Sequence, residues 1–301
     1  MKLTPFGQAL RALRIERGLR LLDMAKTLGC SSAFLSAVET GRKSVPPAFF
    51  ANIVNEYGLA VPEVESLRRA LDRTKKEVKL DEVSDENREL VAAFARKVDE
   101  LPQDVIDELK KKVFKSCSGE TPFLRRRRGI RVPAHTTLTL WDYADKIRSA
   151  FVADDELEFP VMDVLEFRMQ RFFPEFCFDV WDADEMDGDE GRVMAGLDGL
   201  ILRQDVYERA WDRRGRDRFT ACHELGHYLM HRHIPMARAS APEDKIYTDS
   251  EWQADTFAGA LLLPRRHATR FQEPASAAEA FGITEHAAEV MLDKYRRRDA
   301  L

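Results

Sequence analysis

Apolar residues recur at helical spacing through the first sixty positions of the chain. Between 5 and 17, the residues Phe6, Leu10 and Leu13 fall on one face of a helix. Glycines at 18, 29 and 41 interrupt the pattern and are expected to end helices, and Pro47 is expected to begin the next helix. Helices are therefore predicted at 5–17, 21–28, 32–40 and from 47 onward. Four or five short helices joined by glycine-containing turns predict a helix-turn-helix domain over residues 1–60.

The next stretch, 61–118, keeps the helical spacing in highly charged sequence. Helical segments are predicted at 63–78, at 85–98 and after Pro102. Their apolar stripes are narrow, which leaves two possibilities open: this extension forms a homodimer, or it packs under the first domain. Polar, turn-forming residues at 116–122 then predict a linker, and four arginines follow at 125–128.

Helices and strands mix in the remainder of the chain, 119–301. Helical spacing returns at 138–151, 161–172 and 277–298, alternation at 176–181 predicts a strand, and 193–195 with 199–203 predict a hairpin. The fold class is therefore predicted to be multi-domain, with an all-α domain followed by an α+β domain.

A His-Glu-x-x-His motif at 223–227 supplies candidate metal-binding and catalytic residues in the second domain. On a helix, His223 and His227 lie on one face, about 6 Å apart along the axis. Two imidazoles at this spacing bind one metal ion, usually zinc. Glu224 lies about 100° around the helix, which suits a general base acting on water. The alternative is a buried helix that merely contains two histidines.

A second helical segment offers a third ligand. Catalytic zinc takes three protein ligands and leaves one position open. Glu251 and Asp255 are spaced to share a helix face. Glu251 is predicted to bind the metal, and Asp255 to accept the N–H of a ligand histidine. The alternative is a solvated acidic face.

These motifs resemble a known family. HELGHYLMH at 223–231, EWQADTFA at 251–258 and LLLP at 261–264 are similar to the ImmA/IrrE family of zinc metallopeptidases, over roughly residues 120–301. The resemblance implies a zincin-like fold and cleavage of regulatory proteins, often repressors or antitoxins. It also implies that Glu251 is the third ligand. Zinc peptidases commonly hold substrate as an added strand at a sheet edge, and Gly199–Arg203 is the predicted edge.

Residues 6–58 resemble the XRE, or lambda-repressor-like, family. The resemblance is carried by Leu13-Arg14, Arg17-Gly18, Met24-Ala25, Leu28-Gly29, Leu35-Ser36, Val38-Glu39 and Gly41-Arg42. It implies DNA binding, with 32–40 as the recognition helix. Ser32 and Ser36 would face the groove, but small residues read bases poorly. Arg42, Lys43 and Ser31 are candidate phosphate contacts. The alternative is a helical protein-interaction module.

Charge is unevenly distributed along this chain of net charge −5. Residues 1–60 carry eight Lys or Arg against four acids, which suits nucleic acid, whereas 152–191 carry fourteen acids against two arginines. We expect the acidic stretch to be a solvated face. Four cysteines form no CxxC pair, there is no apolar N-terminal leader, and no apolar run approaches the ~20 residues of a membrane span. A cytoplasmic location without membrane contact is expected.

Together these patterns predict a DNA-binding regulatory zinc metalloendopeptidase. Its partners would be promoter or operator DNA and a repressor or antitoxin-type protein, or this chain itself, cut within 116–131. Tyr247 is the candidate oxyanion donor. His231, about 12 Å along the helix from His223, is expected to donate a hydrogen bond in the cleft. Two alternatives stay open: a metal-binding transcription regulator that cuts nothing, and an antitoxin-like binding protein.

Overall fold

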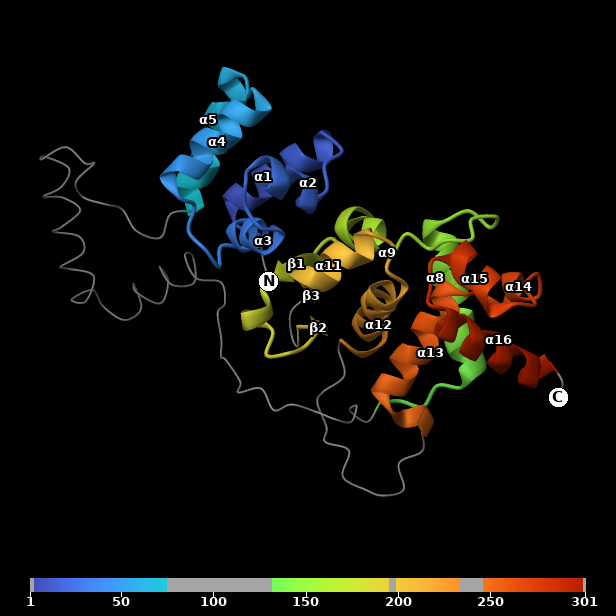
Figure 1. Cartoon of the computed structure of the whole chain (residues 1–301). Coiled ribbons are helices and arrows are strands. Elements are labelled where there is room, and N and C mark those ends of the chain that lie inside the picture. Colours follow the sequence, from blue (N-terminus) through green and yellow to red (C-terminus); the bar gives the residue numbers. More distant parts are fainter. Residues whose placement is uncertain (1–2, 75–131, 195–198, 233–245, 300–301) are drawn as a thin grey trace, which may run out of the picture. The chain divides into compact units, whose positions relative to one another are not determined.

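The computed structural model describes residues 3–74, 132–194, 199–232 and 246–299, and Figure 1 traces their elements along the chain. Several predictions lie outside these residues. They are the helices at 85–98 and after Pro102 with their dimer contact, the linker, the arginines at 125–128 and the self-cleavage joint.

Within residues 3–74 the chain forms five helices: α1 (Pro5–Glu16), α2 (Leu21–Thr27), α3 (Ser32–Thr40), α4 (Pro47–Tyr57) and α5 (Val61–Thr74). Helix α3 begins where Ser31 accepts a hydrogen bond from the backbone N–H of Phe34 (3.0 Å). It ends at Gly41, whose left-handed φ of 76° favours glycine. Helix α5 packs against α1, and the Thr74 hydroxyl accepts from the Phe6 N–H (2.9 Å). The predicted helices are therefore present, and α5 packs against α1.

The rest of the described chain mixes helices with a small sheet, which confirms the α+β prediction. Its elements are α8 (Thr137–Phe151), α9 (Val161–Asp163), the π-helical turn η3 (Val164–Arg168), α10 (Met169–Phe172), β1 (Cys177–Trp181), η4 (Ala183–Glu185), β2 (Gly191–Val193), β3 (Gly199–Arg203), α11 (Gln204–Trp211), α12 (Gly215–His231), η5 (Ile246–Thr248), α13 (Ser250–Leu262), α14 (Arg265–Ala268), α15 (Pro274–Phe281) and α16 (Glu285–Asp299).

The three strands of this sheet are ordered β1-β3-β2. Strand β3 pairs antiparallel with β2, as the hairpin prediction required, and parallel with β1 on its other side. The prediction that Gly199–Arg203 is an edge strand is therefore wrong. A hairpin pattern reports only the local pairing, whereas the parallel partner β1 comes from more than twenty positions earlier in the sequence. The edges of this sheet are β1 and β2.

Close helix packing places the two motif-bearing helices side by side. A Cβ atom on Gly226 of α12 would lie only 3.0 Å from the Phe257 ring of α13, so glycine permits this approach. Buried Arg148 on α8 donates to the carbonyl oxygens of Leu261 (3.1 Å) and Leu157 (2.6 Å). These charge-assisted bonds anchor the end of α13. The packing therefore fixes how α13 faces α12.

In the described part of the chain, no cysteine belongs to a group of possible metal ligands. Cys222 is fully buried in the core between its helix neighbours, as expected of a packing residue. Cys30, Cys177 and Cys222 are free thiols, and burial raises the pKa of Cys222 to about 12. Across the described ranges, no helix is long and apolar enough to cross a membrane.

Candidate active site

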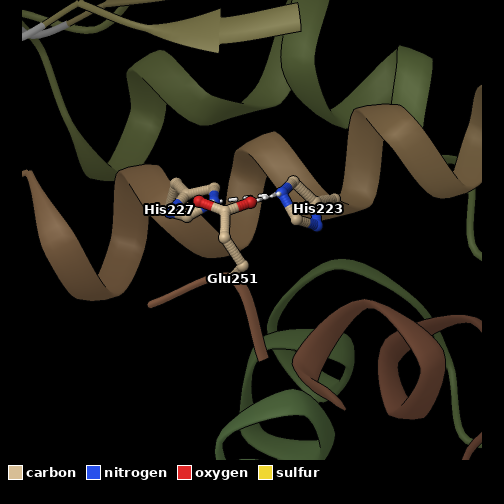
Figure 2. A group of neighbouring side chains, drawn as sticks. All are labelled: His223, His227 and Glu251. Atoms are coloured by element: carbon tan, nitrogen blue, oxygen red, sulfur yellow. Dashed lines mark hydrogen bonds and ion pairs between the residues drawn. The ribbon is translucent and has the colours of Figure 1, made fainter. Parts of the chain in front are cut away.

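Two histidines and one glutamate converge between α12 and α13 (Figure 2). The Nε2 atoms of His223 and His227 lie 3.0 Å apart. The Glu251 carboxylate faces both rings, with one oxygen 3.3 Å from Nε2 of His223 and the other 3.4 Å from Nε2 of His227. Donor atoms about 2.0–2.1 Å from a tetrahedral zinc lie about 3.3 Å from each other. The three side chains therefore have the spacing of a zinc ligand set.

The start of α13 positions Glu251. Asp249 caps this helix by accepting hydrogen bonds from the backbone N–H groups of Glu251 (2.8 Å) and Trp252 (3.0 Å). Since these bonds order the first helical turn, Glu251 is carried on a rigid backbone. Its side chain is about half exposed, at 51%, which leaves one side of the cluster open to a substrate.

Asp255 supports His223 from one turn further along α13. Its Oδ1 atom lies 2.8 Å from Nδ1 of His223, so His223 donates there and its Nε2 faces the cluster. Burial lowers the pKa of His223, but the carboxylates of Asp255 and Glu251 outweigh burial and raise it to about 10. A hydrogen bond from His223, together with the neighbouring ring of His227, holds the pKa of Glu251 well below its usual range. The cluster therefore attracts positive charge.

A chain of hydrogen bonds fixes the ring of His227 in the same way. The Gln253 amide nitrogen donates to the carbonyl oxygens of Pro133 and Tyr247 (both 2.8 Å), which leaves its Oε1 as an acceptor. His231 Nε2 lies 3.0 Å from that oxygen and must donate to it. Its Nδ1 then accepts from Nδ1 of His227, also at 3.0 Å. The proton of His227 is thereby held on Nδ1, and Nε2 keeps its lone pair for a metal.

Glu224 lies on α12 beside the edge strand β2. Its side chain is buried, and burial raises its pKa above the ordinary value. A Cβ atom on Gly191 would lie 2.6 Å from Glu224 Cγ, so a glycine is needed where β2 crosses this side chain. A carboxylate with a raised pKa is a stronger base than an ordinary one, which suits proton transfer next to this cluster.

The sequence comparisons agree with this geometry. Residues 180–293 match the family model of the IrrE N-terminal-like domain, of peptidase family M78, and residues 5–67 match a helix-turn-helix domain. The chain contains an IrrE N-terminal-like domain. No curated protein matches the chain. The matched segment runs from β1 to α16 and includes every residue of the candidate site except the backbone of Pro133.

The IrrE N-terminal-like domain contacts Ser36, Arg42 and Lys43, three of the predicted DNA-binding residues. Ser32 and Ser36 of α3 are buried, at 1% and 2% exposure. Arg42 and Lys43 pair with acids of the segment after β1, and Ser31 serves as the cap of α3. The acidic stretch is therefore not only a solvated face: part of it is an intramolecular contact surface.

Some site residues of the IrrE N-terminal-like domain were missed by sequence reasoning. Gln253 and Gly191 carry no local motif, because their roles depend on contacts with distant segments. His231 is 6% exposed and donates to Gln253, so it does not donate into an open cleft as expected. The spacing of four between His227 and His231 could have indicated that the two rings contact each other on one helix face. Tyr247 lies in η5, and its carbonyl oxygen accepts from Gln253.

Proposed function

We propose that this chain is a DNA-binding regulatory zinc metalloendopeptidase. The observation that carries the proposal is the convergence of His223, His227 and Glu251 beside buried Glu224, within an IrrE N-terminal-like domain. A site that only stores metal has no use for a buried carboxyl group next to an open ligand cluster. The proposed substrate is a repressor or antitoxin-type protein in stress or mobile-element control.

The residues of the cluster have distinct proposed roles. His223, His227 and Glu251 would hold zinc, which when bound lowers the pKa of a water molecule and polarises the scissile carbonyl. Asp255 and His231 orient the two imidazoles through their Nδ1 atoms.

Glu224 is the proposed general base. It accepts a proton from the attacking water and returns it to the leaving amine. Its raised pKa favours both steps, because the protonated acid is then available when the amine departs. Tyr247 is proposed to donate to the oxyanion.

The substrate backbone is proposed to pair with β2. This strand is an edge of the sheet and passes next to Glu224 at Gly191. An extended peptide added to β2 would therefore bring its backbone carbonyls towards the ligand cluster. This assignment replaces Gly199–Arg203, which lies in the centre of the sheet.

Two matched variants test the enzyme assignment. Glu224→Gln keeps the size of the side chain and removes the base, so we expect a zinc-loaded protein that cuts nothing. Glu251→Ala should lose most of the zinc, measured by metal analysis after dialysis. The probe is a capture of partner proteins on Glu224→Gln, followed by incubation of each partner with wild-type protein. Equal processing by Glu224→Gln and wild type would instead support the regulator that cuts nothing. Capture without cleavage by wild type would support the antitoxin-like binding protein.

The helix-turn-helix domain is proposed to bind promoter or operator DNA. Arg42 and Lys43 would contact phosphate, with Ser31, Ser32 and Ser36 near the groove. Small side chains on α3 predict modest discrimination between sequences and strong salt dependence. Duplex binding measured at several salt concentrations tests this. If a chain in which Arg42 and Lys43 are released from their acidic partners does not bind DNA at low salt, the protein-interaction module is supported.

A further inference from the structure

Helix α3 lies against the edge strand β1, at whose end the match to the IrrE N-terminal-like domain begins. The Ser36 hydroxyl accepts a hydrogen bond from the backbone N–H of Val180 (3.0 Å) and donates to the carboxylate of Asp179. Asp179 is itself buried, at 1% exposure. Since an edge strand offers unpaired backbone groups, α3 covers this edge much as a neighbouring strand would. The face of α3 predicted to enter the DNA groove is therefore occupied.

The two candidate phosphate contacts are occupied as well. The Arg42 guanidinium lies 2.8 Å from Glu185 and 3.3 Å from Asp179, and it stacks over the Trp181 ring at 4.5 Å. The Lys43 ammonium lies 3.4 Å from Asp182. We call residues 179–185 the acidic segment. Its carboxylates take the positions that phosphate oxygens would take around these two cations.

A second group of contacts, outside the acidic segment, also holds the helix-turn-helix domain. Glu166 of η3 is buried and accepts from Arg14 (2.6 Å) and from the backbone N–H of Leu21 (2.6 Å). Tyr207 of α11 donates to Glu166 (2.9 Å) and accepts from the Leu22 N–H (3.3 Å). Buried, fully paired groups of this kind define one orientation of the two surfaces.

We propose that the acidic segment masks the DNA-binding surface of the helix-turn-helix domain, so that duplex DNA and the acidic segment compete for α3, Arg42 and Lys43. This inference rests on the proposed DNA binding. The masked edge is β1, whereas the edge beside Glu224 is β2. In the masked state the chain does not bind DNA but keeps its peptidase site accessible, and in the unmasked state it binds DNA.

The test uses the full chain with two charge-reversal variants. Asp182→Lys with Glu185→Lys breaks the contacts to Lys43 and Arg42. Glu285→Lys with Glu289→Lys on α16 makes the same change in net charge at exposed positions. Binding to a random-sequence duplex is measured at fixed salt, together with amide hydrogen exchange of β1. We expect the first variant to bind DNA about tenfold more tightly than the second, because masking lowers the fraction of competent chains. Faster exchange at Val180 should appear in the first variant alone.

Each result is decisive for one part of the inference. Equal DNA binding by wild type and both variants would overturn masking. Fast exchange at Val180 in the wild type would overturn the docked arrangement itself. Faster exchange in the first variant without any DNA binding at low salt would overturn competition with DNA. That last outcome would place the failure in the proposed DNA binding, since the exchange difference would still show that the acidic segment holds α3 in the wild type.

Discussion

At the scale of single residues, the candidate site depends on where protons sit on three imidazoles. Asp255 accepts a hydrogen bond from Nδ1 of His223, and His231, itself held by Gln253, accepts one from Nδ1 of His227. Both candidate ligand histidines therefore turn Nε2 towards the cluster. A ligand ring in the wrong tautomer would have a proton where the metal should bind. The proposed zinc site therefore depends on these supporting residues as well as on the proposed ligands.

The first prediction concerns His231. In His231→Ala the Nδ1–H of His227 loses its acceptor, so we expect zinc affinity to fall about 10–100-fold, as is typical when such a supporting partner is removed. Competition with a chelator of known affinity measures it. His286→Ala, an 85% exposed histidine on α16, is the control and should bind zinc like wild type. Unchanged affinity in His231→Ala would show that the hydrogen-bond chain does not support the site.

The second prediction concerns pH. The pKa of His223 in the metal-free chain is about 10, above the ordinary value, so His223 is protonated at neutral pH. Zinc must displace this proton, and zinc affinity should therefore rise as the pH is raised towards about 10. Calorimetry in buffers of different ionisation enthalpy should show proton release on zinc binding at pH 7. Asp255→Asn weakens the hold on this proton and should reduce the release. Identical release in both proteins would contradict the assigned cause.

At the scale of elements, the site is made by the approach of α12 to α13. Neither helix holds a complete ligand set, since α12 supplies the two histidines and α13 supplies Glu251. Gly226 permits the approach, and Arg148 anchors the far end of α13. Metal affinity and helix packing should therefore change together.

The third prediction tests this packing. Gly226→Val forces a branched side chain against Phe257, where even one Cβ atom would lie at 3.0 Å. We expect the free energy of unfolding to fall by about 1–3 kcal/mol, as for other overpacked cores, and zinc affinity to fall with it. Urea unfolding of the metal-free chain and chelator competition measure the two effects. Adding Phe257→Leu makes room and should recover part of both. A stable Gly226→Val chain with normal affinity would argue against the packing account.

At the scale of the whole molecule, the helix-turn-helix domain shares a charged contact with residues 166–185, and this contact has a buried part and an exposed part. Arg14 and Glu166 are 2% and 1% exposed, whereas the Glu185 side chain is 36% exposed. Removing one partner of a buried pair leaves buried donors without an acceptor, but an exposed pair contributes little to stability. The two parts of the contact should therefore respond differently to mutation.

The fourth prediction compares them. Glu166→Ala should lower the free energy of unfolding by about 1–3 kcal/mol, because the Leu21 N–H and the Tyr207 hydroxyl lose a buried acceptor, while Arg14 keeps Glu39 as its partner. Glu185→Ala should cost less than about 1 kcal/mol. Urea unfolding of the full chain gives both values. Equal losses would mean that the buried pair does not stabilise the contact.

Sequence alone determined the local elements of this protein and indicated its candidate metal ligands. Helical periodicity and caps predicted α3 and α13, and the spacing of 223, 227 and 251 predicted a cluster that the tertiary structure brings together. These features follow from the 3.6-residue turn, which a short stretch of sequence contains in full. The prediction of Gly199–Arg203 as an edge strand was wrong because the pairing of β3 with β1 depends on a distant part of the sequence.

Only the tertiary structure decided which segments meet. The parallel pairing of β1 with β3, the place of Gln253 behind His231, and the docking of α3 on β1 all join residues far apart in the sequence. Ser36 and Arg42 illustrate the reason: their types suit DNA, yet here they contact Asp179 and Glu185. A side chain's chemistry limits what it can bind, but the fold determines which partner is within reach.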